Sequence, residues 1–141
     1  MAEIIYIYNK NIVQNDISSN IRWLEIEKDY DVYNQHIELC GQKSMSKTTW
    51  NDIYCYGTIY CGLFIDEIMV ARACVEKYSD DCWEVADVKV VQEYRNKGYA
   101  KAVCQYVLSF ILENQKKPTI RTEENNYTMQ RVIASLGFIK L

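Results

Sequence analysis

The sequence has 141 residues, of which 49% are hydrophobic and 13% aromatic, which is enough for one packed domain and excludes wholesale disorder. Its formal net charge of −3 argues against a general nucleic-acid binder, because such proteins carry a basic surface. No apolar run approaches the roughly 18 to 20 residues that span a bilayer, and the start "MAEIIYIYNKN" lacks the basic region of a signal peptide. We therefore expect a single domain over residues 1–141, with no nucleic-acid partner and no membrane attachment.

The six cysteines lie in apolar stretches such as "IYCGLFI" and "ARACVEK", where cysteine behaves as a small core residue. None belongs to a C-x-x-C pair, and His36 is the only histidine that could help them bind a metal. We read His36 as a surface or helix-packing residue and expect no metal and no disulfide framework. Without an export signal, reduced cysteines predict a cytoplasmic protein.

In the first half of the chain, "EIIYIY" (residues 3–8) is rich in isoleucine and tyrosine and predicts a strand. Residues 18–39 are mixed in charge with spaced apolar positions, and we expect one or two helices there. The polar stretch "GQKSMSKTTWND" predicts a loop that leads to a short helical turn. The runs "YCYGTIYCGLFI" and "IMVARACVEKY" predict a hairpin that turns at Asp66 and Glu67.

In the second half, a third strand is expected in "CWEVADVKVV". Residues 98–113 predict a helix, Pro118 precedes a short strand "TIRT", and a second helix runs from about Asn126 to Leu136. Gly137 stands where a C-terminal helix cap belongs. The order of strands and helices predicts an α/β fold with a mixed sheet flanked by helices.

The third strand changes its alternation, because Val85 is on the wrong parity to share a face with Val88 and Val90. A bulge near Ala86 to Val88 would produce this slip and would free backbone N–H and C=O groups from the ladder. A strand that is buried on both faces would also account for it, and composition alone favours that simpler reading.

The segment "YRNKGYAKAV" (residues 94–103) places basic residues and Gly98 where this strand leads into a helix. A helix start offers unpaired N–H groups and a positive dipole end, so phosphates bind there readily. The fingerprints of dinucleotide-binding and P-loop proteins are missing from the sequence. On its own, such a basic helix start is more often a solvated surface than a binding site.

The segment "VKVVQEYRNKGYAKAV" resembles the acetyl-CoA signature of the GNAT superfamily of N-acyltransferases, with Arg95, Gly98 and Ala100 at its three defined positions. Downstream, "NYTMQRVIASLGF" is similar to the family's helix that begins with asparagine and ends in Leu-Gly-Phe. The two motifs occur in family order and cover residues 82–138. The first third of the chain adds nothing to the resemblance.

The resemblance implies a single-domain GNAT-like fold and an acetyl-CoA-dependent N-acetyltransferase that acts on a primary amine of a small molecule or peptide. Backbone N–H groups of residues 95–100 would hold the CoA pyrophosphate, the strand would pair with the pantetheine arm, and the bulge would direct an N–H at the thioester oxygen. The residues that it implies for the cofactor are Val88, Val90, Arg95, Asn96, Lys97, Gly98, Tyr99, Ala100, Lys101 and Asn126.

Transfer to an amine requires a base, because an alkylamine with a pKa of about 10.4 is almost fully protonated at neutral pH. Glu84 falls at the strand position where many family members keep a base glutamate, and Asp87 is the second candidate. Ile133 stands where many relatives carry a tyrosine that is thought to protonate the CoA thiolate, so the general acid is unassigned. The alternative is therefore a CoA-binding regulatory or interaction module without transferase activity.

The tail also departs from the family, whose members usually follow the Leu-Gly-Phe helix with two further strands. Here "FIKL" can form at most one very short strand, which implies a shortened C-terminus. The uncovered sheet edge would then be covered by the N-terminal region, by a second copy of the chain or by a partner. We expect self-association, and hence a homodimer.

Overall fold

The computed structural model describes residues 2–8 and 20–141, which form one seven-stranded sheet and four α-helices. The strands are β1 (Glu3–Tyr8), β2 (Ile21–Trp23), β3 (Ile59–Ile65), β4 (Ile68–Lys77), β5 (Cys82–Val90), β6 (Lys117–Glu123) and β7 (Phe138–Lys140). The helices are α1 (Tyr30–Leu39), α2 (Lys47–Cys55), α3 (Tyr99–Glu113) and α4 (Tyr127–Leu136), and a short 3₁₀ turn (Gln92–Tyr94) precedes α3.

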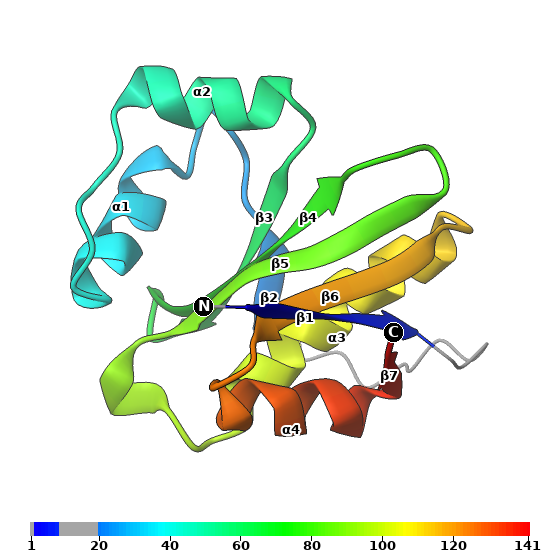
Figure 1. Ribbon diagram of the computed structural model, residues 1–141. Coiled ribbons are helices and arrows are strands. Elements are labelled where there is room, and N and C mark those ends of the chain that lie inside the picture. Colours follow the sequence, from blue (N-terminus) through cyan, green and yellow to red (C-terminus); the bar gives the residue numbers. More distant parts are fainter. Residues whose placement is uncertain (1, 9–19) are drawn as a thin grey trace.

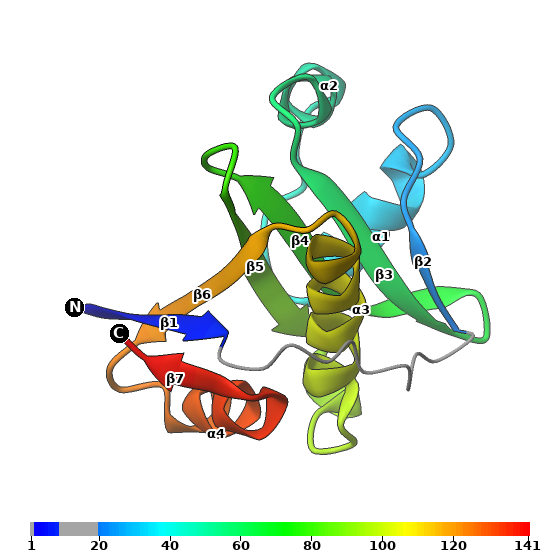
Figure 2. The same ribbon diagram turned by 90° about the vertical axis from the view of Figure 1, so that its right-hand side faces the viewer.

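The strands are ordered β2-β3-β4-β5-β6-β1-β7, and the only parallel neighbours in this described sheet are β5 and β6. Figure 1 shows α1 and α2 on one side of the sheet and α3 and α4 on the other. Figure 2 shows α3 lying along β3, β4 and β5. The expected α/β fold with a mixed sheet flanked by helices is confirmed. Within the described ranges, no helix is long and apolar enough to cross a bilayer.

Each face of the sheet buries its own apolar cluster. The larger cluster lies under α3 and α4 and includes Val85, Val107 and Ile133. The smaller cluster lies under α1 and α2 and contains a chain of ring contacts that runs from Tyr54 through Trp50 and Tyr33 to Tyr60. All six cysteines are free thiols, and three of them are buried.

Two expectations for the first half need correction. Part of the stretch that was expected to be helical forms strand β2, which pairs with β3, and its first residues, 18 and 19, lie outside the described residues. Isoleucine and tryptophan fit a half-buried strand, and this packing outweighs the helical spacing. The expected short turn is the nine-residue helix α2, which begins after Ser46, whose side chain accepts a hydrogen bond from the Thr49 N–H. Its Trp50 is fully buried and donates to the carbonyl of Ile26.

Most other elements match the sequence-based expectations. The hairpin turns at Asp66 and Glu67, both with positive φ, as a two-residue turn with matching twist requires. Helices α3 and α4 and strand β6 lie where the apolar spacing and Pro118 predicted them. Gly137 ends α4 in the left-handed conformation, with φ of 104°.

Strand β1 lies between β6 and β7 and pairs antiparallel with both (Figure 1). The N-terminal region therefore covers the edge of β6, which is one of the three sources considered for that cover. The three-residue strand β7 pairs with β1 and agrees with the expectation of one very short strand from "FIKL". A homodimer is not needed to cover β6 and stays a prediction.

The expected bulge in β5 is confirmed. Ala86 pairs with Cys74 and Lys89 pairs with Arg72, so Asp87 and Val88 both lie opposite a single residue of β4. Because of this extra residue, Val85, Val88 and Val90 all reach the apolar cluster under α3 despite their different parity. The alternative of a regular strand buried on both faces is thereby excluded.

Candidate active site

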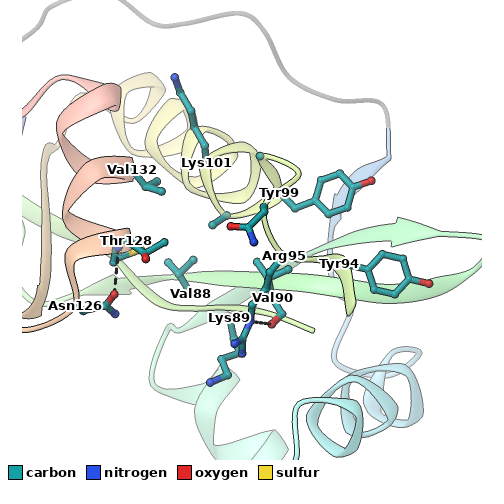
Figure 3. A pocket seen from close by; sticks show the side chains of 14 residues that line it. Val88, Lys89, Val90, Tyr94, Arg95, Tyr99, Lys101, Asn126, Thr128 and Val132 are labelled. Atoms are coloured by element: carbon teal, nitrogen blue, oxygen red, sulfur yellow. Dashed lines mark hydrogen bonds between the residues drawn. The ribbon is translucent and has the colours of Figure 1, made fainter. Parts of the chain in front are cut away.

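Strands β5 and β6 separate halfway along their length, and this separation makes room for a ligand. Their parallel pairing runs from Cys82 opposite Lys117 to Val85 opposite Ile120 and then stops, although both strands continue. A cavity of about 520 Å³ lies beyond this point, between the end of β5, the start of α3 and the start of α4 (Figure 3). A smaller cavity of about 120 Å³ continues between the two strands, and Val88 lines both.

The loop into α3 presents backbone N–H groups to the larger cavity. Asn96 and Gly98 have φ of 64° and 83°, so left-handed residues flank Lys97. Such turns form concave anion sites, and the first N–H groups of a helix have no carbonyl partner within it. Gly98 is the N-cap of α3 and offers no side-chain cap, and a Cβ built on it would meet no described atom within 4 Å. The space in front of these N–H groups is therefore open.

Nine of the ten residues expected to hold the cofactor line this cavity; Lys97 does not. The nine are Val88, Val90, Arg95, Asn96, Gly98, Tyr99, Ala100, Lys101 and Asn126. Arg95 folds back toward the strand, since its Nε donates to the Val90 carbonyl at 3.2 Å. Five lining residues were not singled out as ligand contacts from the sequence: Lys89, Tyr94, Thr128, Met129 and Val132.

The sequence could have indicated only some of these five residues. Met129 follows Asn126 by three residues and Val132 follows Met129 by three, so each successive pair is adjacent on the surface of α4. Lys89 and Tyr94 flank residues of the signature, but side-chain direction at a strand end next to a bulge cannot be read from spacing. Figure 3 shows Tyr94 and Tyr99 on the side of the cavity away from Asn126 and Thr128.

Asn126 caps α4 and also lines the cavity. Its Oδ1 accepts a hydrogen bond from the Met129 N–H at 3.1 Å, which fixes the orientation of the amide (Figure 3). The Nδ2 group makes no hydrogen bond to any other described residue, so it can donate to a ligand. The helix cap and the expected ligand contact are therefore compatible.

Asp87 lies at the bulge with φ of 49°, and its side chain is 40% exposed. Its Oδ2 accepts a hydrogen bond from the Tyr60 hydroxyl at 2.5 Å, and its Oδ1 accepts from Arg72 Nη2 at 3.0 Å. Burial raises the pKa of Tyr60 above its ordinary value of 10, so the hydroxyl stays protonated and donates. Burial alone would lower the pKa of Arg72, but the hydrogen bond with Asp87 and the attraction of its charge together outweigh burial and raise the pKa. Asp87 lines the smaller cavity.

Glu84 is placed differently. It is 2% exposed, its Oε1 accepts from the Thr119 hydroxyl at 2.9 Å, and Arg121 Nε lies 2.9 Å from its Oε2. Within the described structure Glu84 lines neither of the two cavities, whereas its partner Arg121 lines the smaller one. The two candidate bases thus have different surroundings, with Asp87 beside the smaller cavity and Glu84 behind Arg121.

The position that departs from the family motif lies in the core. Ile133 is fully buried under the sheet, in the same cluster as Leu136. Tyr127, the tyrosine next to Asn126, is exposed and does not line the larger cavity. Neither residue can therefore meet a ligand in that cavity as the structure stands.

Solved structures share this fold. A GNAT-family protein from Novosphingobium aromaticivorans DSM 12444 superposes with a TM-score of 0.79 at 22% identity, over 99% of this chain and 59% of its own. AAC(6')-Iy, in complex with the bisubstrate analogue CoA-S-monomethyl-acetylneamine, gives 0.71 at 15% identity, over 84% and 89%. The ribosomal-protein-S18-alanine N-acetyltransferase from Escherichia coli gives 0.69 at 18% identity, over 86% and 77%. This chain thus spans about three fifths of the Novosphingobium protein.

These structures define the class, an α/β acetyltransferase fold. Residues 21–138 match the family model described as the acetyltransferase (GNAT) family. The chain belongs to this family, as the two sequence motifs indicated. Strand β1 lies outside the matched residues. No curated protein sequence matches this one.

Proposed function

We propose that this chain is an acetyl-CoA-dependent N-acetyltransferase that acts on a primary amine. The observation that carries the proposal is a single cavity bounded by the open N-terminus of α3 at one end and by the bulge of β5 at the other. The left-handed loop and the charges of Lys89, Arg95 and Lys101 fit a pyrophosphate, and the open space at Gly98 admits it. The strand beyond Val88 fits an extended arm that pairs with its backbone.

When bound, acetyl-CoA supplies a thioester whose carbonyl carbon forms a C–N bond with the amine while the C–S bond breaks and the electron pair leaves on sulfur. The role of the chain is to hold the two reactants in line and to stabilise the negative charge that develops on the carbonyl oxygen. A backbone N–H of the bulge serves this purpose because it is fixed before the reaction. The amine proton passes to Glu84, directly or through water, or to Asp87.

The thiolate needs no acid from the protein in this proposal, because a thiol with a pKa of about 8.5 is a fair leaving group. The alternative, a CoA-binding module without transfer, is supported by the buried Ile133. Release of free thiol from acetyl-CoA in the presence of amines tests the proposal, and calorimetry with CoA separates the alternative. CoA binding without thiol release from any amine would favour the alternative.

The amines to be tested as acceptors follow in part from the relatives. AAC(6')-Iy was solved with an analogue that contains neamine, and the Escherichia coli enzyme is named for an alanine of ribosomal protein S18, so an aminoglycoside and a peptide that begins with alanine belong among them. A polyamine, free amino acids and a lysine peptide complete the set, since the acceptor varies independently of the fold. We propose a cytoplasmic location, which six free thiols support. A homodimer is retained as a proposal for measurement.

A further inference from the structure

Asp87 has a backbone conformation that its surroundings must enforce. Its φ of 49° lies in the left-handed region, where a residue with a Cβ is strained by roughly 1 to 2 kcal/mol. The other described residues with positive φ outside glycine lie in turns or loops, namely Asp66, Glu67, Asn96 and Gln115. Asp87 alone among them stands inside a strand. Strain of this kind persists only where neighbouring groups hold it.

The groups that hold it come from two other strands. Tyr60 on β3 and Arg72 on β4 each donate a hydrogen bond to one carboxylate oxygen of Asp87, at 2.5 and 3.0 Å. Both donors are buried, and both bonds go to a charged acceptor, which makes them stronger than neutral hydrogen bonds. Together they fix the carboxylate from two directions while one side of it faces solvent.

The burial of Arg72 lowers the stability of the fold. The residue is 2% exposed, and its Nε and Nη1 have no hydrogen-bond partner among the described residues. Besides Asp87, its Nη2 donates a hydrogen bond, within the part of the chain that the structure describes, only to the side-chain oxygen of Gln42, at 3.1 Å. A buried guanidinium with unpartnered N–H groups costs free energy that an apolar residue of similar size would avoid. This cost is consistent with a role for Arg72 in fixing the position of Asp87.

We propose that Tyr60 and Arg72 are positioning residues, which hold the Asp87 carboxylate and thereby keep the β5 bulge in the shape that acetyl transfer requires. The inference rests on the proposed function. Val88, the residue after Asp87, lines both cavities, so the backbone angles of Asp87 set where the Val88 amide and side chain lie at their junction. A loosened anchor lets the bulge move, and small displacements of a reacting geometry cost large factors in rate.

Tyr60→Phe is the test, because it removes one hydroxyl and leaves the ring in the aromatic cluster. We expect kcat to fall about tenfold, as for loss of a hydrogen bond to a charged group, with KM for acetyl-CoA changed less than about twofold. With Glu84 as the base, the pH profile should keep its shape, because positioning lowers kcat equally at every pH. In an Asp87→Gly background, the same substitution should change kcat by less than about twofold, since the hydroxyl then has no carboxylate to hold.

The matched control is Tyr54→Phe, because Tyr54 belongs to the same cluster of rings. This substitution removes a hydroxyl that donates to the Leu24 carbonyl at 3.1 Å. It should reduce stability by a similar amount and leave kcat unchanged. A wild-type kcat in Tyr60→Phe would overturn the inference. So would a double variant in which Tyr60→Phe lowers kcat by the same factor in the Asp87→Gly background as it does in wild type.

A second measurement separates this inference from the proposed function. If the wild-type protein transfers acetyl to no amine, the proposed function fails and kinetics say nothing about the anchor. Backbone ¹⁵N relaxation then decides: in Tyr60→Phe the order parameters of Asp87 and Val88 should fall from about 0.85 toward about 0.6, and in Tyr54→Phe they should not. Unchanged order parameters in Tyr60→Phe would overturn the inference on their own. If Asp87→Gly does not fold, the order parameters of Asp87 and Val88 in Tyr60→Phe still test the inference.

Discussion

Arg121 holds Glu84 across the junction where the parallel strands β5 and β6 are about to separate, with its Nε at 2.9 and 3.1 Å from the two carboxylate oxygens. Glu84 is 2% exposed whereas the Arg121 side chain is 37% exposed, so the pair reaches from the interior to the cavity side. A base at Glu84 therefore has solvent contact only past Arg121. This favours proton transfer through a water over direct contact with the amine.

Glu84→Gln should lower kcat/KM by roughly 10²- to 10⁴-fold and flatten the acidic limb of its pH profile. CoA affinity should barely change, because Glu84 does not line the larger cavity. The fold should survive, since a glutamine oxygen can still accept from Thr119 and the guanidinium of Arg121 stays partly solvated. An unaltered pH profile would remove Glu84 from the role and leave Asp87 or bulk water as the proton acceptor.

Thr119→Val is the control for this variant. It removes the hydroxyl that donates to Glu84 Oε1 but keeps the carboxylate and the branched shape of the side chain. We expect less than about a tenfold loss in kcat/KM, the size of one hydrogen bond, and a pH profile of unchanged shape. A loss as large as that of Glu84→Gln would show that local packing and not the carboxylate matters.

Gly98→Asp should abolish CoA binding in calorimetry without unfolding the chain. The new carboxylate would lie in the open space before the α3 N-terminus, where the pyrophosphate is proposed to bind. Gly98→Asn is the matched control, because asparagine has the same shape and tolerates a positive φ but carries no charge. We expect Asn to weaken binding at least about tenfold less than Asp, with a difference that shrinks as salt is added. Equal affinity of Gly98→Asp and wild type would contradict the phosphate site.

Much of this site was predictable because its residues are close in sequence. The segment from Val88 to Lys101 forms one strand end, one turn and one helix start, so the local motif and the three-dimensional site nearly coincide. The slip between Val85 and Val88 also fitted a strand buried on both faces, and it indicated the bulge only together with the resemblance. Lys97 is the exception within this segment, because side-chain direction in a left-handed turn does not follow from spacing.

The hydrogen bonds that Tyr60 and Arg72 donate to Asp87 could not be predicted in this way. Tyr60 and Arg72 belong to two other strands, and only the register of β3, β4 and β5 brings them to Asp87. The position of β1 between β6 and β7 was also open from the sequence, because an isolated "EIIYIY" strand fits any sheet edge. Long-range strand pairing decides both features, and a single sequence carries little information about it.

His36 should make the stability of the protein depend on pH between about 4 and 6.5. It is fully buried, and its Nδ1 lies 3.0 Å from the Met69 carbonyl, so the neutral ring donates from Nδ1. Burial lowers its pKa from 6.5 to about 4. Between these values only the unfolded chain is protonated, so stability is complete above pH 6.5 and falls as pH drops toward 4, by about 3 kcal/mol.

Urea unfolding at several pH values tests this. His36→Asn is the comparison, because its amide can donate from nearly the same place and does not titrate; its stability should vary less between pH 6.5 and 4. The hydrogen bond from Arg22 holds the pKa of Asp29 below its ordinary 3.8. The stability that this pair contributes is therefore lost at lower pH and does not overlap with the effect of His36. Equal slopes for His36→Asn and wild type would contradict the assignment.

Strand β1 should be essential for closing the sheet, and its backbone directions define the test. The Glu124 N–H donates to the Ala2 carbonyl and the Leu141 N–H donates to the Ile5 carbonyl. Because backbone groups alternate along a strand, those of Ile4 face β6, opposite Thr122.

Ile4→Pro removes an N–H that faces β6, and proline does not fit a strand where its N–H side is paired, so it should lower the free energy of unfolding by about 2 to 3 kcal/mol. Ile4→Val keeps the N–H and the branched shape and should cost about 1 kcal/mol. Uncovering β6 should also promote association. Light scattering of the wild-type chain at micromolar concentrations distinguishes a monomer, with a mass near 16.6 kDa, from the proposed homodimer. In either case Ile4→Pro should raise the mass relative to wild type, and Ile4→Val should not. A wild-type dimer whose mass and stability do not respond to Ile4→Pro would show that β1 is not what closes this edge in solution.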